Sequence, residues 1–140
     1  MTNLLEELVK YLASTTSLVA GQSAFYNEML ETPAKCILVQ ELPTSMYVPV
    51  QIDAELHKIK ITARDINNTT AKTLAVNCWQ RLLTNDETFD NDPSRDITGF
   101  ITLLDGTTIQ VSLYGAPVWE RADQQGRKYF TFYAVVLCKR

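Results

Sequence analysis

The chain has a single histidine, and its cysteines are not clustered. His57 is the only histidine among 140 residues, and no cysteine lies near it in the sequence. A metal site or a catalytic triad needs several such groups in one oriented set. We therefore expect no catalytic residues, no metal ligands and no enzyme activity. We interpret His57 as a solvated or lightly packed side chain.

The three cysteines are odd in number and widely spaced. Cys36, Cys78 and Cys138 each lie within an apolar run. Free buried cysteines behave as small hydrophobic residues, and disulfides are rare in reducing compartments. We interpret all three as reduced core residues.

Glycine, basic charge and long apolar runs are also limited. The five glycines form no loop that would cradle a phosphate, and a net charge of -3 gives no general attraction to nucleic acid. The apolar runs fall short of the roughly 20 residues that cross a bilayer, and Glu6 and Glu7 occupy the place of a basic secretion signal. We expect no cofactor, no membrane contact and no sequence-specific nucleic acid.

The rest of the composition is typical of a globular protein. Hydrophobic residues make up 46% and charged residues 21% of the chain. A chain of this length buries roughly two-thirds of its surface on folding, which is enough for one core. With no internal repeat and no long linker, residues 1–140 are expected to form a single domain.

Apolar residues at helical spacing predict two helices. The first covers residues 4–13, follows the capping residue Asn3 and ends before the hydroxyl-rich stretch 14–17. The second covers residues 69–83 and follows several side chains that are able to cap it.

Several segments between the two predicted helices have the composition of strands. Short runs at 24–28 and 35–40 predict strands, and Pro49 makes the segment after Tyr47 an edge strand or an extended arm. Residues 58–64 alternate with a period of two, which predicts a half-exposed antiparallel strand. Its outer side chains are expected to form an exposed basic face: Lys58, Lys60, Thr62 and Arg64.

The last third of the chain is rich in strand signals. Residues 100–104 and 108–114 flank Asp105-Gly106, a strong hairpin signal because both residues tolerate positive φ. A second turn at 123–126 precedes a long strand at 128–138. Consecutive strands joined by short turns predict an α+β fold, with a mainly antiparallel sheet and two helices packed on one face.

An acidic stretch at 85–96 has little apolar content, and we expect a mobile, solvated loop. It lacks the central glycine and the terminal glutamate of a calcium-binding loop. The loop's acidic residues are Asp86, Glu87, Asp90, Asp92 and Asp96.

The final strand is the candidate interface with other subunits or partners. Its second half is apolar on both faces, so one face needs a cover beyond the two helices. Aromatic residues near Arg127 and Lys128 are also compatible with base stacking, but packing against the core and a neighbour is favoured. The side chains on the candidate face are Tyr129, Thr131, Tyr133, Val135 and Leu137.

The order of these elements resembles that of small tailed-phage proteins of the minor capsid and tail terminator family. The likeness covers nearly the whole chain and rests on an amphipathic first helix followed by a few short stretches. These stretches are residues 36–41, 56–65, 71–83, 115–117 and 123–127.

The resemblance implies a structural protein of the virion, assembled in the host cytoplasm. Such proteins form a ring, expected here to be a hexamer, that caps the tail tube and joins it to the head. The implied partners are copies of the same chain, the tail tube protein and a head-completion or neck protein. No cofactor is implied.

A second hypothesis remains open. A small α+β domain of this kind is also able to bind a small molecule or a peptide in a pocket between sheet and helices, without catalysis. The size of the protein in solution would separate the two hypotheses.

Overall fold

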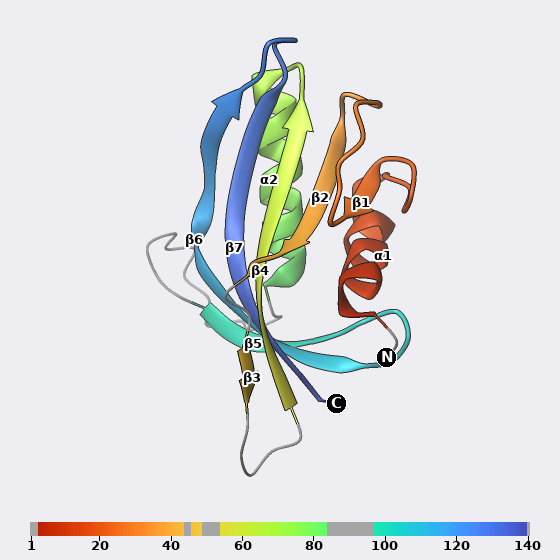
Figure 1. The fold of residues 1–140 in the computed structure, drawn as a ribbon, viewed down its shortest axis with the longest axis vertical. Coiled ribbons are helices and arrows are strands. Elements are labelled where there is room, and N and C mark those ends of the chain that lie inside the picture. The colour runs from red at the N-terminus through yellow and green to blue at the C-terminus, as the bar shows by residue number, and fades with distance from the viewer. Residues whose placement is uncertain (1–2, 44–45, 49–53, 84–96, 140) are drawn as a thin grey trace.

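The computed structural model describes residues 3–43, 46–48, 54–83 and 97–139. Within them, two helices and seven strands form an α+β fold around one sheet (Figure 1). The elements are α1 (Leu4–Thr16), β1 (Ala24–Tyr26), β2 (Cys36–Glu41), β3 (Met46–Val48), β4 (Ala54–Asp65), α2 (Asn68–Leu82), β5 (Ile97–Thr102), β6 (Thr108–Ala122) and β7 (Lys128–Lys139).

The sheet is mostly antiparallel, as the sequence predicts. Its strand order is β1-β2-β4-β7-β6-β5, and β3 pairs with β4 beside this path. Among the seven described strands, β1 and β2 pair in parallel and the other pairs are antiparallel. The centre of the sheet is the pairing of β4 with β7, which runs in unbroken register from Ala54 opposite Lys139 to Asp65 opposite Lys128.

Helix α1 is longer than the sequence predicts. Asn3 caps its start by accepting a hydrogen bond from the Glu6 amide, as expected. The hydroxyls that were expected to end the helix instead donate back to its own carbonyls, Ser14 to Tyr11 and Thr16 to Leu12. The helix therefore continues to Thr16 and ends where Ser17 adopts a left-handed conformation.

Helix α2 matches its predicted range to within one residue at each end. The side chain of Asn67 accepts from the Thr70 amide and caps the first turn. The buried side chains of α2 contact β4, β6 and β7, while α1 contacts β1, β2 and α2. Apolar residues of both helices share one core with strand residues such as Ile37, Ile61 and Phe132.

The hairpin between β5 and β6 forms at the predicted turn. Gly106 has a φ of 89°, and the Leu103 amide donates to the Thr107 carbonyl across the turn. The second predicted turn also forms, because the Gly126 amide donates to the Asp123 carbonyl between β6 and β7. Local turn chemistry is therefore sufficient to place both reversals of the chain.

Strand β6 passes the point at which we expected it to stop. It extends from Thr108 to Ala122, with shifts in its pairing to β7 between Tyr114 and Val118 and between Trp119 and Arg121. Gly115 has a φ of 74° and Pro117 lies within the first shift. Proline has no amide hydrogen to donate to the neighbouring strand, and a shift in pairing accommodates it. The strand therefore bends at Pro117 instead of ending there.

The expected basic face of β4 is only partly exposed. Thr62 and Arg64 are 5% and 2% exposed. The Arg64 guanidinium donates to the carbonyls of four residues in the segment between β1 and β2, which lies over that end of the sheet: Leu30, Glu31, Pro33 and Ala34. The prediction of a solvated basic face is therefore wrong at this end.

A second small cluster packs under the same segment. Phe25, Cys36 and Leu38 are buried together, and Met29 packs against them. Arg127 fastens the segment from the other side, since its guanidinium donates to the Glu31 carbonyl at 2.7 Å and to Asp123 at 2.6 Å.

Replacing Arg64 tests the role of this contact. Arg64→Met keeps most of the side-chain volume but removes the donors to four carbonyls, so we expect the free energy of unfolding to fall by about 2 kcal/mol. Urea denaturation followed by circular dichroism measures the change. Arg121→Met is the control, because the exposed Arg121 only stacks on Tyr129 at 3.8 Å and should cost less than about 1 kcal/mol. Equal losses in both variants would contradict the assignment.

Candidate functional site

The outer face of the sheet is the face that carries Tyr133 of β7 and its cross-strand partners. Tyr133 pairs with Lys60 of β4 and with Tyr114 of β6, and residues directly opposite each other lie on one face. Tyr114, Val118 and Tyr133 are 47%, 58% and 41% exposed. We call these three residues the sheet patch.

The predicted interface residues divide into two groups along β7. Tyr129 and Thr131 are buried within the subunit, at 6% and 3% exposure. Tyr133 is exposed, and Val135 and Leu137 are half-buried. The pairing of β7 with β4 puts the five side chains on one face, as the alternation predicts, and only the second half of that face is exposed or half-exposed.

Contacts within the subunit explain why the first half is covered. The Tyr129 hydroxyl donates to Asp123 at 3.0 Å, and Arg121 stacks on the Tyr129 ring. The Thr131 hydroxyl donates to the carbonyl of Ile61 at 3.1 Å. Tyr129 and Thr131 therefore make their contacts within the subunit and are too buried to contact another molecule.

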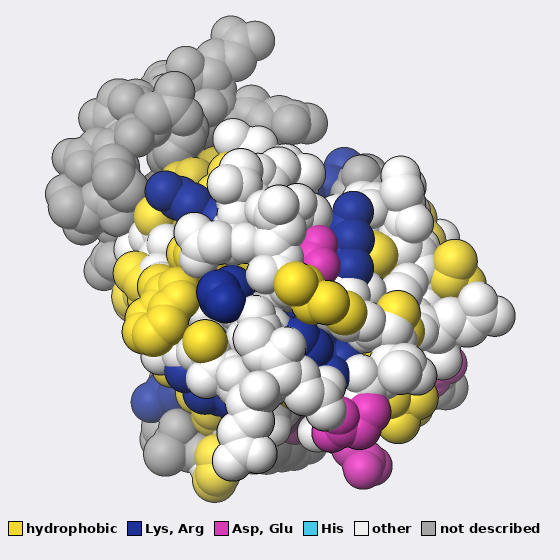
Figure 2. Space-filling model, turned by 90° about the horizontal axis from the view of Figure 1, so that it is seen from above, with side chains coloured by type: hydrophobic (Ala, Val, Ile, Leu, Met, Phe, Trp, Pro, Cys, Tyr) yellow, Lys and Arg dark blue, Asp and Glu magenta, His cyan; other side chains and the backbone are white. Residues whose placement is uncertain are grey.

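Strand β6 also carries an exposed apolar side chain on the other face of the sheet. Trp119 is 56% exposed, but it pairs with Phe130 of β7, a core residue, so it lies on the face opposite Val118. Figure 2 shows a group of hydrophobic side chains on the left of the molecule, the side on which Figure 1 places β6. Lys60 and Glu120 form an ion pair at 2.5 Å between β4 and β6, so charged groups adjoin the apolar ones. An apolar centre beside charged groups is the usual anatomy of a protein interface.

The predicted acidic loop lies outside the described residues. This applies to all five of its acidic positions, Asp86, Glu87, Asp90, Asp92 and Asp96.

Four potential ligand side chains gather on the opposite face of the sheet, where β2, β4 and β7 lie side by side. The His57 imidazole contacts Glu41 through Nδ1 and lies 3.0 Å from Glu55 through Nε2. Cys138 pairs with Glu55 across β4 and β7. One ligand atom each from Glu55, His57 and Cys138 lies within 4.8 Å of the other two. We call these three residues with Glu41 the His57 cluster.

Sequence reasoning missed the His57 cluster. It dismissed a metal role because no cysteine follows or precedes His57 closely, yet antiparallel pairing brings Cys138 to the same place from the far end of the chain. The only available signal was the Glu-x-His spacing of Glu55 and His57, which puts both side chains on one face of a strand.

The chemistry of the His57 cluster favours binding over nucleophilic attack. Burial, with Glu55 and Glu41 as further causes, raises the pKa of the Cys138 thiol, so the reactive thiolate is disfavoured. Both ring nitrogens of His57 contact carboxylates. Neither nitrogen is therefore directed at a hydroxyl nucleophile in this arrangement.

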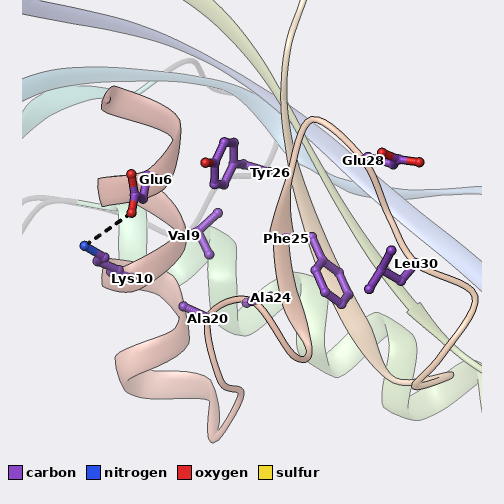
Figure 3. A pocket seen from close by; sticks show the side chains of 10 residues that line it. Glu6, Val9, Lys10, Ala20, Ala24, Phe25, Tyr26, Glu28 and Leu30 are labelled. Carbon is purple, nitrogen blue, oxygen red and sulfur yellow. Dashed lines mark ion pairs between the residues drawn. The ribbon is translucent and has the colours of Figure 1, made fainter. Parts of the chain in front are cut away.

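A cavity of about 420 Å³ lies between α1 and β1. Figure 3 shows its lining side chains, which come from α1, from β1 and from the segments before and after β1. Lys10 on its wall forms ion pairs with Glu6 at 3.7 Å and with Glu7 at 3.5 Å. The cavity is large enough for a small ligand, but the charge of Lys10 on its wall is already paired within α1.

A scan of the chain against protein-family models finds no match, and a search of curated proteins finds none either. Among the described residues, neither helix has the length and apolar character needed to cross a membrane.

The three thiols provide a check on this arrangement. All are buried and free, and burial raises the pKa of Cys78 to about 12. We expect the folded protein to react slowly with a thiol reagent at neutral pH, because little thiolate is present, and to react faster as the pH rises. Denatured protein should expose all three thiols at once. Rapid labelling of Cys138 in folded protein, located by mass spectrometry, would place it outside the core.

Proposed function

We propose that this chain is a structural assembly protein of a tailed-phage virion, a tail terminator whose ring caps the tail tube and joins it to the head. The proposal rests on the resemblance in element order and on one structural observation, the apolar sheet patch of Tyr114, Val118 and Tyr133. Its partners would be further copies of the chain, expected as a hexamer, the tail tube protein and a head-completion or neck protein. This role requires no catalysis.

The arrangement of the helices supports an open face for a neighbour. We propose that α1 and α2 both cover the face that carries Ile61 and Phe132, since residues of both helices share a core with them. The segment between β1 and β2 covers part of the outer face through Arg64. The part of that face over β6 and the middle of β7 remains exposed.

The occupant proposed for the sheet patch is a second copy of the chain. A closed ring joins two different surfaces of each subunit, so the sheet patch would form one half of a head-to-tail contact. Tyrosine and tryptophan are enriched in the centres of interfaces because they offer large apolar areas with a polar tip. Tyr114 and Tyr133 of the sheet patch fit that composition.

A binding domain without catalysis is the second candidate. The cavity between α1 and β1 is the observation that favours it, because its volume of about 420 Å³ lies within the usual range for small-molecule sites. This alternative predicts a monomer that shows no rings.

A charge in the sheet patch tests the assembly proposal. Tyr133→Glu places a carboxylate beside Lys60 in the free subunit, which the fold should tolerate, but the charge would be buried by a neighbour. We expect at least a tenfold weaker association, equivalent to about 1.4 kcal/mol. Light scattering over a concentration series gives the mass, and electron microscopy shows whether rings form.

Two further variants control for charge and for folding. Ile66→Glu adds the same charge at a side chain that is 61% exposed but lies outside the sheet patch, so assembly should be unchanged. Val136→Glu, at 1% exposure on the core face, should unfold the subunit, which circular dichroism would show. A parent protein that stays monomeric up to its solubility limit, without rings, would refute the proposal.

A further inference from the structure

The His57 cluster joins three strands that are distant in sequence. Glu41 ends β2, Glu55 and His57 lie on β4, and Cys138 lies near the end of β7. Pairing places Glu41 opposite Ile59 and Cys138 opposite Glu55, so all four side chains share the face that carries Ile59. The convergence therefore follows from the register of the sheet.

The donor atoms of Glu55, His57 and Cys138 lie close to the spacing that a single metal ion requires. Thiolate, imidazole and carboxylate around tetrahedral zinc are separated by about 3.3–3.8 Å at the usual bond lengths. The Nε2 atom of His57 lies 3.0 Å from Glu55 Oε2, and the three donor atoms of Glu55, His57 and Cys138 lie within 4.8 Å of one another. Rotation about side-chain bonds is enough to close the remaining difference.

Glu41 orients the imidazole for such a role. It contacts Nδ1, while Nε2 faces Glu55. A carboxylate that accepts the Nδ1 proton fixes the tautomer whose Nε2 lone pair is free to bind a metal, and ligating histidines usually have a partner of this kind. Glu41 therefore has the position of an orienting group, with Nε2 as the ligand atom.

Charge and access are also suitable. Two carboxylates and a thiol surround a single imidazole, so a divalent cation would balance the negative charge of the group. The side chains of His57 and Glu55 are 18% and 36% exposed, whereas Cys138 is only 3% exposed. An ion from solution would reach the first two ligands directly and meet the thiol at the inner end.

We propose that Glu55, His57 and Cys138 bind one divalent transition-metal ion of the zinc class, with Glu41 holding the imidazole. Mixed sulfur, nitrogen and oxygen ligands suit zinc better than magnesium or calcium, which take oxygen ligands alone. The ion would fasten β7 to β4 near the end of their pairing. This inference goes beyond the assembly role and does not depend on it.

Titration of the full chain with zinc and with cobalt tests the proposal. Calorimetry should show one zinc ion per chain, and the cobalt complex should show a thiolate charge-transfer band in the near ultraviolet. Cys138→Ala should abolish that band. Glu55→Gln, which changes a partly exposed side chain and should leave the fold intact, should weaken zinc binding. Glu41→Gln should weaken it by about 10–100-fold, the usual effect of losing a group that orients a ligand.

Cys78→Ala is the matched control. It removes another buried thiol, on α2, and should leave the stoichiometry and the cobalt band unchanged. Circular dichroism establishes that each variant is folded. The proposal is overturned if the folded parent takes up no zinc, or if Glu55→Gln and Cys138→Ala bind it as tightly as the parent and Cys78→Ala do. Either result would leave the cluster as a histidine held between two carboxylates, without a metal role.

Discussion

The pairing of β4 with β7 is the constraint on which the rest of this structure depends. Its twelve residue pairs put Ile59 and Ile61 on the core face together with Phe132 and Ala134. A shift of one residue would turn every one of these side chains toward the other face. The same register sets Tyr133 beside Lys60 and Cys138 beside Glu55. Core, sheet patch and His57 cluster are therefore consequences of a single alignment.

Polar contacts within the chain cover one end of the outer face and leave the sheet patch exposed. At one end, Arg64 and Arg127 hold the segment between β1 and β2 through its carbonyls. Asp123 completes this region: although burial opposes its ionisation, hydrogen bonds from Arg127 and Tyr129 hold the pKa of its carboxyl well below the usual value. Buried guanidinium groups need such partners, since an unpaired charge in the interior is costly. No equivalent contacts cover the sheet patch in the described part of the chain, which leaves its apolar side chains exposed.

Local signals in the sequence predict the helices, strands and turns well here. They do not predict contacts between residues that are distant in the chain. The cap at Asn3, the turn at Gly106 and the period of two in β4 each act within a few residues, so the elements follow from them. The burial of Arg64 depends on a segment some thirty residues away in the chain. The proximity of Cys138 to His57 depends on strand order, which no single segment encodes. A period of two identifies opposite faces but does not tell which of them will be covered.

The sheet patch and the His57 cluster lie on opposite faces of the sheet and share strand β7. Tyr133 and Cys138 are separated by five residues on β7, a distance of about 17 Å along an extended chain. A bound ion would therefore not touch a neighbour seated on Tyr133. It would act only through the strand, by limiting how far the end of β7 moves away from β4. Because the two features share a strand but no atoms, loss of the ion would leave the chemistry of the sheet patch unchanged, and any effect on assembly would have to come through the position of β7.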